Sequence, residues 1–395
     1  MAANTSSPVP SNDIELYRKK RRRKRKLRRL GTVAVVLVIA GIMTLLATNY
    51  GFGSIYDLLR GNVPKNSGES VGFPKKLFGD RPLQFGRCGS SLVMATDGKL
   101  YFYSDKGETL LNLPHSYTRP SVYCTDNRVL LYDRGGNDFQ VATDKGVSFE
   151  QEMANEIICG AMNNGGSVAI ATTEERYAGS VTVYSAQNKQ LFKWYSSDGQ
   201  ITGAALRDDG WLAVSCIGAK DGVILSTVYL MNISWGEGQQ VVSVPFTDMM
   251  ILSARFKSNG SLCVIGDTKV SFLSTGGEIQ AEYPYSKNIS DFADLSGNHT
   301  AVALSSSANS EEREIVLLDN GGNQIGSYTV KQTIKWIEVV DGAVYILGEN
   351  EILRLDSHMN LVEQIPVRSD TTKIAVIGSA VYALGLGEIS VAGTQ

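Results

Sequence analysis

The stretch DGKLYFYSDKGETLLNL, residues 97–113, contains the pattern that decides the fold. It places two short segments rich in Tyr, Phe and Leu next to turns that contain Gly. Apolar segments of about four to six residues between such turns predict antiparallel strands joined by tight hairpins. The pattern returns as NGSLCVIGDTKVSFLSTGGEIQAEY at 259–283, DGAVYILGENEILRLDSHMNLVEQI at 341–365 and SAVYALGLGEISVAG at 379–393. A repeat of about 40 residues indicates stacked copies of one small unit.

Eight units can be counted from their innermost strands. We expect these strands to start near Gln84, Ser121, Ile157, Ile201, Ile251, Ile289, Ile334 and Ile374. A four-stranded unit buries both its faces only when its copies stack around an axis, so the sequence predicts an all-β propeller over residues 71–395. Eight blades are preferred and seven are the alternative. The last unit has only three strands, and VGFPKKLF at 71–78 would supply its outermost strand and close the ring.

An apolar run without any charge, GTVAVVLVIAGIMTLLAT at 31–48, precedes the repeats. Because about 20 helical residues cross the hydrocarbon core of a bilayer, we expect one transmembrane helix over residues 30–50. A block of eleven Lys and Arg residues before it should hold this flank in the cytoplasm. A cleaved signal peptide is the alternative, but Ala47-Thr48-Asn49 is a poor cleavage site. The membrane-orienting block consists of Arg18, Lys19, Lys20, Arg21, Arg22, Arg23, Lys24, Arg25, Lys26, Arg28 and Arg29.

We therefore expect a single-pass protein of the plasma membrane with four parts. The four parts are a disordered basic cytoplasmic tail at 1–29, the transmembrane helix at 30–50, a linker at 51–70 and an extracellular propeller at 71–395. Beyond residue 30 the chain has 27 Lys and Arg against 38 Asp and Glu. This acidic balance excludes nucleic acid as a partner, whereas the basic block favours contact with the lipid bilayer.

The basic tail, the single anchor and degenerate repeats such as DGKLYFYSDKGE, which lack a W-D signature, resemble an uncharacterised bacterial family. Its members are single-pass membrane proteins, mainly from Gram-positive anaerobes. Their ectodomains are quinoprotein-like or WD40-like propellers of unknown function. The resemblance covers nearly the whole chain and implies the fold and the anchoring, but no chemistry.

Residues that could carry chemistry are scattered along the repeats. His115, His299 and His358 fall in different units, whereas a zinc site or a His-based triad needs converging side chains. The segment DNGGN at 319–323 lacks the alternating carboxylates of a calcium loop and predicts a hairpin turn. Phosphate-binding and serine-nucleophile motifs are absent. Trp194, Trp211, Trp235 and Trp336 occur singly, which gives no stacking site for a quinone. We therefore predict no catalytic residue, no metal and no cofactor, and a protein that is not an enzyme.

The cysteines are five in number, and each lies on a predicted strand. They are Cys88, Cys124, Cys159, Cys216 and Cys263. We expect them to be small buried hydrophobic residues. A thiol cluster formed by the first three, on neighbouring inner strands, is the alternative.

Three units have long polar connections between their second and third strands, at 172–180, 217–226 and 305–314. In a propeller these connections share one face with the loops that lead into the next blade, so we expect a decorated rim that points away from the membrane. Aromatic and cationic residues on that rim suit recognition of peptides or polymers, and chance placement on turns is the alternative. The predicted ligand-binding residues are Tyr117, Arg119, Arg176, Tyr177, Tyr285, Lys287, Lys331 and Arg368.

Together these features favour a non-catalytic extracellular binding or scaffold module for a protein, a peptide or a cell-wall polymer. Two alternatives stay open. One is an extracellular enzyme that acts on glycans through carboxylates on the decorated face, which requires two of them about 5–10 Å apart. The other is a structural subunit of an envelope complex, which would show a large apolar patch on its blades.

Overall fold

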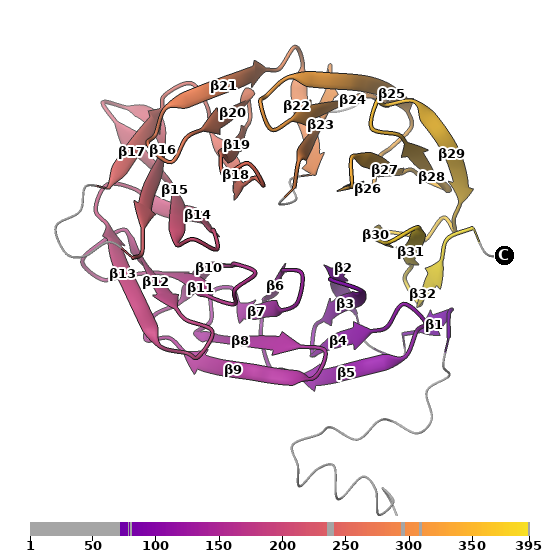
Figure 1. Ribbon diagram of the computed structural model, residues 1–395, viewed down its shortest axis with the longest axis horizontal. Helices are drawn as coiled ribbons and strands as arrows, with labels where there is room; N and C mark the ends of the chain where they lie inside the picture. The colour runs from indigo at the N-terminus through magenta and orange to yellow at the C-terminus, as the bar shows by residue number, and fades with distance from the viewer. Residues whose placement is uncertain are drawn as a thin grey trace, which may run out of the picture. The chain divides into compact units, whose positions relative to one another are not determined.

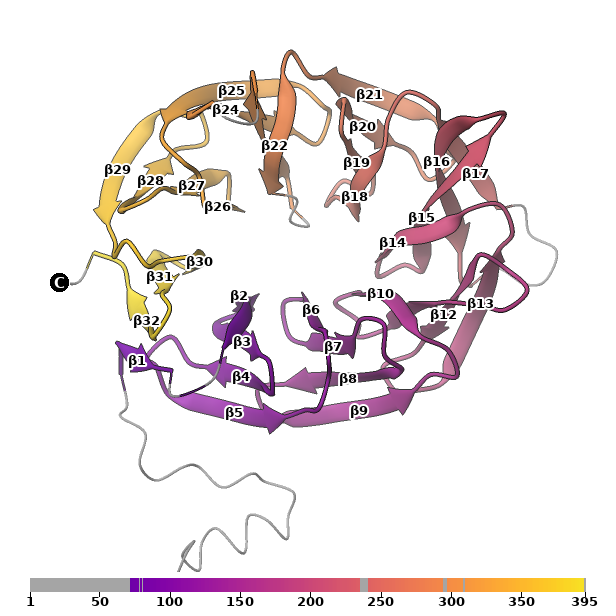
Figure 2. The same cartoon turned by 180° about the vertical axis from the view of Figure 1, so that it is seen from behind.

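The structure, a computed structural model, describes residues 72–77, 79, 81–234, 241–293, 297–307 and 310–393. Within these ranges the chain forms 32 β-strands in eight four-stranded sheets, arranged as a ring (Figures 1 and 2). The predicted eight-bladed, all-β propeller is confirmed, and the seven-bladed alternative is wrong. The described part contains no helix long and apolar enough to cross a membrane. The predicted tail, membrane helix and linker, and Trp235, lie outside the described residues.

Each blade runs from an inner strand to an outer strand, in sequence order except at the closure. Blade 1 has β2 (Pro82–Cys88), β3 (Ser91–Thr96), β4 (Lys99–Tyr103) and β5 (Thr109–Pro114). Blade 2 has β6 (Pro120–Cys124), β7 (Val129–Asp133), β8 (Asp138–Thr143) and β9 (Gly146–Glu152). Blade 3 has β10 (Ile157–Met162), β11 (Val168–Thr172), β12 (Gly179–Tyr184) and β13 (Gln190–Ser196). Blade 4 has β14 (Gln200–Leu206), β15 (Trp211–Lys220), β16 (Val223–Asn232) and β17 (Val242–Phe246).

The second half of the ring follows the same plan. Blade 5 has β18 (Ile251–Phe256), β19 (Leu262–Gly266), β20 (Lys269–Leu273) and β21 (Ile279–Pro284). Blade 6 has β22 (Asn288–Ala293), β23 (His299–Ser305), β24 (Glu312–Asp319) and β25 (Gln324–Lys331). Blade 7 has β26 (Trp336–Val340), β27 (Ala343–Leu347), β28 (Glu351–Leu355) and β29 (Leu361–Pro366). Blade 8 has β30 (Lys373–Ile377), β31 (Ala380–Leu384), β32 (Glu388–Val391) and, as its outer strand, β1 (Lys75–Lys76).

The core lies between the blades. Because each blade packs between two neighbours, its second strand is covered on both sides, and every residue of β3, β11 and β19 is buried. Hydrophobic clusters fill the interfaces, such as the one in which Val93 and Phe102 of blade 1 pack with Leu131 of blade 2. In the outer strand β13, residues 191–195 instead alternate between exposed and half-buried. This explains why the repeats read as continuous apolar runs followed by an alternating segment.

The two faces of the ring carry different connections, because successive antiparallel strands reverse direction. The turns between first and second strands, such as 163–167 and 207–210, lie on one face, which we call the turn face. The connections between blades, such as 115–119, and those between second and third strands, such as 173–178, lie on the other, which we call the loop face. Since β1 is a fourth strand, Gly72 just before it lies on the turn face.

The ring is closed by the amino-terminal strand, as predicted. In β1, Lys75 pairs with Ile389 and Lys76 pairs with Glu388 of β32. The Leu77 amide donates a hydrogen bond to the Gly387 carbonyl at 2.8 Å. Beside these pairs the ring of Phe73 packs on that of Tyr382, with centroids 5.1 Å apart. Blade 8 is therefore assembled from both ends of the propeller sequence.

A recurring hairpin joins the third and fourth strands in five blades. Its first residue is Ser or Asp, whose side-chain oxygen accepts backbone N–H groups of the turn, and its fourth residue has a positive φ. The first and fourth residues are Ser104 and Gly107, Ser185 and Asn188, Ser274 and Gly277, Asp319 and Gly322, and Asp356 and Met359. In DNGGN, Asp319 Oδ1 accepts from the amides of Gly321 (2.8 Å) and Asn323 (2.9 Å). The segment is thus a hairpin turn, as predicted.

The predicted loop at 217–226 is wrong, because it is a β-hairpin. The strands β15 and β16 continue pairing as far as Lys220 and Val223, and Asp221 and Gly222 make the tight turn with φ of 52° and 78°. The apolar residues on both sides of the Asp221-Gly222 turn in IGAKDGVILS are compatible with strands, whereas its polar tip suggested an irregular loop. The hairpin stands on the loop face and exposes Ile224.

Candidate functional site

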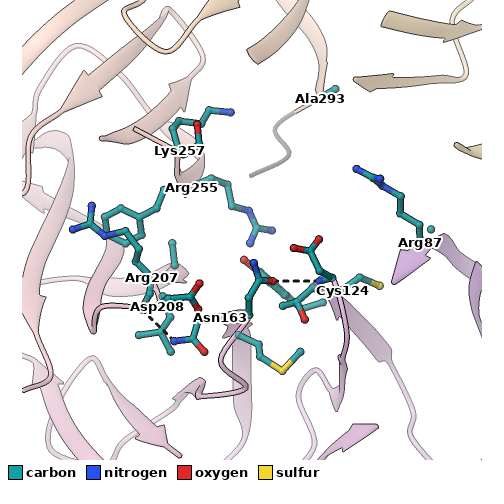
Figure 3. A pocket seen from close by; sticks show the side chains of 18 of the residues that line it. Arg87, Cys124, Asn163, Arg207, Asp208, Arg255, Lys257 and Ala293 are labelled. Carbon is teal, nitrogen blue, oxygen red and sulfur yellow. Dashed lines mark hydrogen bonds between the residues drawn. The ribbon is translucent and has the colours of Figure 1, made fainter. Parts of the chain in front are cut away.

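A cavity of about 1360 Å³ occupies the channel of the ring and reaches the turn face (Figure 3). All eight blades contribute to its wall through inner strands, and several contribute through the turns that follow these strands. Pockets for small molecules are usually about 300–1000 Å³ in volume. The channel cavity is therefore large enough for a segment of a polymer.

The turns at the mouth of the cavity share a local sequence. The segments 162–168 (MNNGGSV), 206–212 (LRDDGWL) and 256–262 (FKSNGSL) each place polar residues before a glycine. That glycine has a φ between 85° and 88°, which residues with a Cβ rarely adopt. The glycine therefore lets the chain turn back into the second strand while the polar residues face the channel.

Hydrogen bonds link these turns in a continuous chain over blades 2 to 6, which we call the turn belt. Between blades 2 and 3, the Asp126 amide donates to Asn164 Oδ1 (3.2 Å). Between blades 3 and 4, Asn163 Nδ2 donates to the Arg207 carbonyl (3.2 Å) and the Gly165 amide donates to Asp208 Oδ1 (3.0 Å). Arg207 Nη1 then donates to the Gly260 carbonyl of blade 5, and Lys257 Nζ donates to the His299 carbonyl of blade 6 (3.1 Å). The turns of blades 7, 8 and 1 are two-residue hairpins, and no hydrogen bond joins them to another turn in the described part of the chain. The mouth of the cavity is thus built asymmetrically.

Two arginines reach into the cavity from different sides (Figure 3). Arg255 on β18 places its guanidinium over the ring of Tyr123, 4.3 Å from the centroid, although Tyr123 belongs to blade 2. Such a cation–π contact fixes the arginine across the channel. The side chain of Arg87 on β2 is exposed and has no hydrogen-bond or ion-pair partner among the described residues. Its guanidinium is therefore available to a ligand.

Two carboxylates lie on the inner strands of neighbouring blades 6 and 7. Asp291 on β22 accepts a hydrogen bond from the adjacent Phe292 amide at 2.8 Å. Glu338 on β26 is only 7% exposed, and its Oε1 accepts from the Val376 amide of blade 8 at 3.4 Å. Burial raises the pKa of Asp291 and raises that of Glu338 to about 7. Both side chains line the channel cavity.

A second, smaller cavity of about 300 Å³ lies on the loop face of blade 7. It is lined by Gln332, Glu349, Asn350, Glu351, Gln364 and Pro366. Gln332 Nε2 donates to Glu351 Oε1 at 3.1 Å. Two residues with carboxylate side chains, Glu349 and Glu351, therefore line a cavity on the loop face.

Comparison with known proteins gives the family of the chain. The model of a family of unknown function, DUF5711, matches residues 81–384, which is nearly the whole propeller. The chain belongs to the DUF5711 family. The comparison with curated proteins yields no relative.

The DUF5711 propeller is also similar to solved structures of WD40 and BamB type. The carboxyl-terminal WD40 domain of Sif2 is 13% identical, with a TM-score of 0.56 over 82% of this chain and 99% of that chain. BamB from Moraxella catarrhalis is 11% identical, with a TM-score of 0.54 over 82% and 99%. Sqt1 from Saccharomyces cerevisiae is 12% identical, with a TM-score of 0.54 over 82% and 98%. At such identities the likeness shows the fold alone.

The predicted ligand-binding residues of the DUF5711 propeller are spread around the loop face, and none lines the channel cavity. Tyr117 and Tyr285 pack against interface clusters, and Tyr285 donates its hydroxyl to the Gly266 carbonyl at 3.1 Å. Lys287 forms an ion pair with Glu314 (3.0 Å), and Arg368 forms ion pairs with Asp370 (3.0 Å) and Glu388 (3.3 Å). Exposed positions are occupied by Arg119, Arg176, Tyr177 and Lys331. The structure therefore does not bring the eight residues together.

One of them, Tyr177, belongs to a local stack on blade 3. Its ring lies 4.8 Å from that of Tyr195, and Lys193 Nζ lies 4.8 Å from the Tyr195 centroid. Lys193 in turn forms an ion pair with Glu174 at 3.0 Å. The stack is held in place by its own strand and loop.

The five cysteines are free thiols in the described structure. Burial raises the pKa of Cys88, Cys124 and Cys159 to about 12 and that of Cys216 to about 11. These four thiols are therefore protonated at neutral pH. Cys88, Cys216 and Cys263 are buried, as expected, whereas Cys124 and Cys159 are half-buried. Among the described residues, no group of three or more His, Cys, Asp or Glu side chains could hold a metal ion.

Sequence reasoning missed the charged residues of the channel. Arg255 in ILSARF and Asp291 in NISDFA lie within predicted inner strands that are otherwise largely apolar or small. A charge inside such a strand is the signal that could have found them, since buried charge requires a partner or a function.

Proposed function

We propose that this chain is a cell-surface binding module that takes a peptide segment of a partner protein into the channel cavity without catalysis. In this proposal residues 30–50 anchor it in the plasma membrane of a bacterial cell, with the basic tail inside and residues 71–395 outside. The positive-inside pattern of the sequence supports that orientation.

The observation that carries the binding role is the channel cavity. Its volume of about 1360 Å³, its reach to the turn face and its mixed polar and aromatic wall suit an extended chain segment. Arg87 and the polar side chains of the turn belt offer hydrogen-bonding groups around its mouth. Propellers of the WD40 and BamB type commonly serve as interaction modules, which supports the proposal by analogy.

Protease treatment of intact cells tests the location. With one epitope tag on the cytoplasmic tail and another after Gln395, we expect the second tag to be lost while the first stays on a small membrane-bound fragment. Permeabilised cells, in which both tags become accessible, are the control. If the second tag is degraded only after permeabilisation, the propeller is internal and the cell-surface role is wrong.

Photo-crosslinking in intact cells tests the cavity as the binding site. With p-benzoylphenylalanine in place of Arg87, ultraviolet light should join the propeller to one defined protein. The same residue in place of Lys331, exposed on the loop face, is the matched control and should give no such product. A product formed only from the Lys331 position would place binding on the loop face instead.

An extracellular enzyme that acts on glycans is the second candidate, favoured by the small cavity on blade 7. Glu349 and Glu351 both line it, and acid–base cleavage of a glycosidic bond uses two carboxyl groups about 5–10 Å apart. Release of reducing sugar from cell-wall polysaccharide by the purified full chain, lost in E349Q/E351Q, would support this function. Equal release by the double variant would exclude these two carboxylates.

A further inference from the structure

The hairpin of β15 and β16 extends beyond the rest of blade 4. The inner strand β14 pairs with β15 only as far as Ile217, and the outer strand β17 pairs with β16 only from Ser226 onward. Residues 218–220 and 223–225 therefore form a two-stranded ribbon, and no further strand flanks it in the described part of the chain. The outer side of residues 223–225, which we call the β16 edge, is an open sheet edge.

The turn of the hairpin determines which backbone groups point to the β16 edge. Asp221 and Gly222 both have a positive φ, as in a type I′ turn, so the flanking residues Lys220 and Val223 form a hydrogen-bonded pair. Bonded and non-bonded pairs alternate along an antiparallel ladder. The N–H and C=O groups of Ile224, in the next pair, therefore point away from β15 and toward the open edge.

Apolar side chains surround this edge. Ile224 is 62% exposed and Val223 is 55% exposed, and as neighbours in a strand they point to opposite sides of the ribbon. Ile224 shares its side with Ser226, whose Oγ accepts a hydrogen bond from the Ile251 amide at 3.3 Å. Ile224 therefore lies on the side of blade 5, where Met250, directly before Ile251, is 43% exposed. Sheet edges in natural proteins usually carry a charge or a proline at such positions, whereas Val223, Ile224 and Leu225 carry neither.

We propose that the β16 edge binds an extended strand of a partner protein, which adds to the sheet of blade 4. This inference goes beyond the proposed function, because none of these residues lines the channel cavity. The partner strand would exchange backbone hydrogen bonds with Ile224. Its alternate apolar side chains would contact Ile224 and Met250 on one side of the sheet.

The position of β17 defines the place that the partner strand would take. β17 ends at Phe246, and the chain then turns toward β18 of blade 5. A strand beside Ile224 would therefore continue the row that β17 leaves unfinished. A second copy of this chain is a poorer occupant, because two such edges would meet over only three residues each. Stable dimers bury more than about 1,000 Å².

Fluorescence anisotropy with a labelled peptide tests the proposal. The probe alternates four Thr with three Val between two terminal Lys residues, and the full chain is held in a phosphatidylcholine nanodisc. A Val of this peptide would lie opposite Ile224, with its N–H facing the β16 edge. The same peptide with methylated Val nitrogens is the matched control. It should bind at least about tenfold more weakly, because each lost hydrogen bond weakens binding several-fold.

Two variants of the edge give a second readout. Ile224→Lys keeps the hairpin but places a charge at the edge, and it should weaken binding of the unmethylated peptide at least about tenfold. Ile224→Pro removes the N–H that points to the edge and should have a similar effect. Leu386→Lys is the matched control, because it adds the same charge to the loop face of blade 8, at a side chain that is 73% exposed. It should change binding by less than about threefold.

The results also separate this inference from the proposed function. Equal binding of the methylated peptide, equal loss in I224K and L386K, or no binding to the wild-type chain would each overturn the proposal. Light scattering that shows a wild-type dimer, lost in I224K, would mean that a second copy covers the edge instead. If the edge fails in these ways while the Arg87 position still crosslinks its partner, the channel remains the binding site. If only the crosslink fails, the edge stands without the channel.

Discussion

A chain that starts at residue 81 is expected to be less stable than one that starts at residue 71 by about 2–4 kcal/mol, and to self-associate. The shorter chain lacks β1, so it loses the contact of Phe73 with Tyr382 and the hydrogen bond from Leu77 to Gly387. The edge of β32 then remains unpaired and can pair with another chain. Chemical denaturation followed by light scattering measures both effects.

Phe73→Ala in the longer chain is the control for this prediction. It removes the ring that packs on Tyr382 but keeps the pairing of Lys75 and Lys76 with β32. Its stability should therefore fall between those of the two chains, without self-association. Identical stability of the chains that start at 71 and 81 would show that the ring does not need its amino-terminal strand.

Glu338→Gln is expected to stabilise the propeller above about pH 7 and to leave it nearly unchanged near pH 4.5. Burial raises the pKa of this carboxyl group from 4.5 to about 7, so the folded state holds a proton that the unfolded state has released. The resulting cost is absent below the unfolded pKa and complete above the folded one. At about 1.4 kcal/mol per pKa unit, it reaches about 3 kcal/mol at most.

Denaturation of both proteins at about pH 5 and about pH 8 measures this difference. Burial lowers the pKa of His115 and of His299, which gives a stability slope of the opposite sign, but these terms cancel between wild type and variant. Glu175→Gln, at an exposed loop position, should show no pH-dependent difference from wild type. A constant gap between wild type and E338Q at both pH values would mean that Glu338 does not titrate in this range.

The fold was predictable because burial dictates the repeat. The second strand of each blade packs between two neighbouring blades, so most of its residues are apolar, as in β3, β11 and β19, and this makes the period readable. The closure of the ring by residues 71–78 could be predicted because the last unit has only three strands and each blade needs four. The hairpin of β15 and β16 was missed because a polar tip such as Lys220-Asp221-Gly222 occurs equally in loops and in paired strands.

The cavity was not predictable in the same way, because its contacts join residues that no local pattern relates. The stacking of Arg255 on Tyr123 connects blades 5 and 2, and the position of an arginine within a strand does not reveal which ring it will meet. The burial of the predicted ligand-binding residues on the loop face was also hard to predict from the sequence. A tyrosine after a turn, such as Tyr117, reads as exposed, although it packs against the cluster between blades 1 and 2.

The turn belt has a mechanical consequence. Over blades 2 to 6 each turn is tied to the next, so a radial force on one of these blades is shared by its neighbours. Among the described residues, the two-residue turns of blades 7, 8 and 1 lack such bonds, and lysine side chains join these blades instead. Lys335 donates to the Ser369 carbonyl between blades 7 and 8 (2.8 Å), and Lys373 donates to the Leu83 carbonyl between blades 8 and 1 (2.9 Å). The ring is therefore held from turn to turn along blades 2 to 6, and from lysine to backbone where the two chain ends meet.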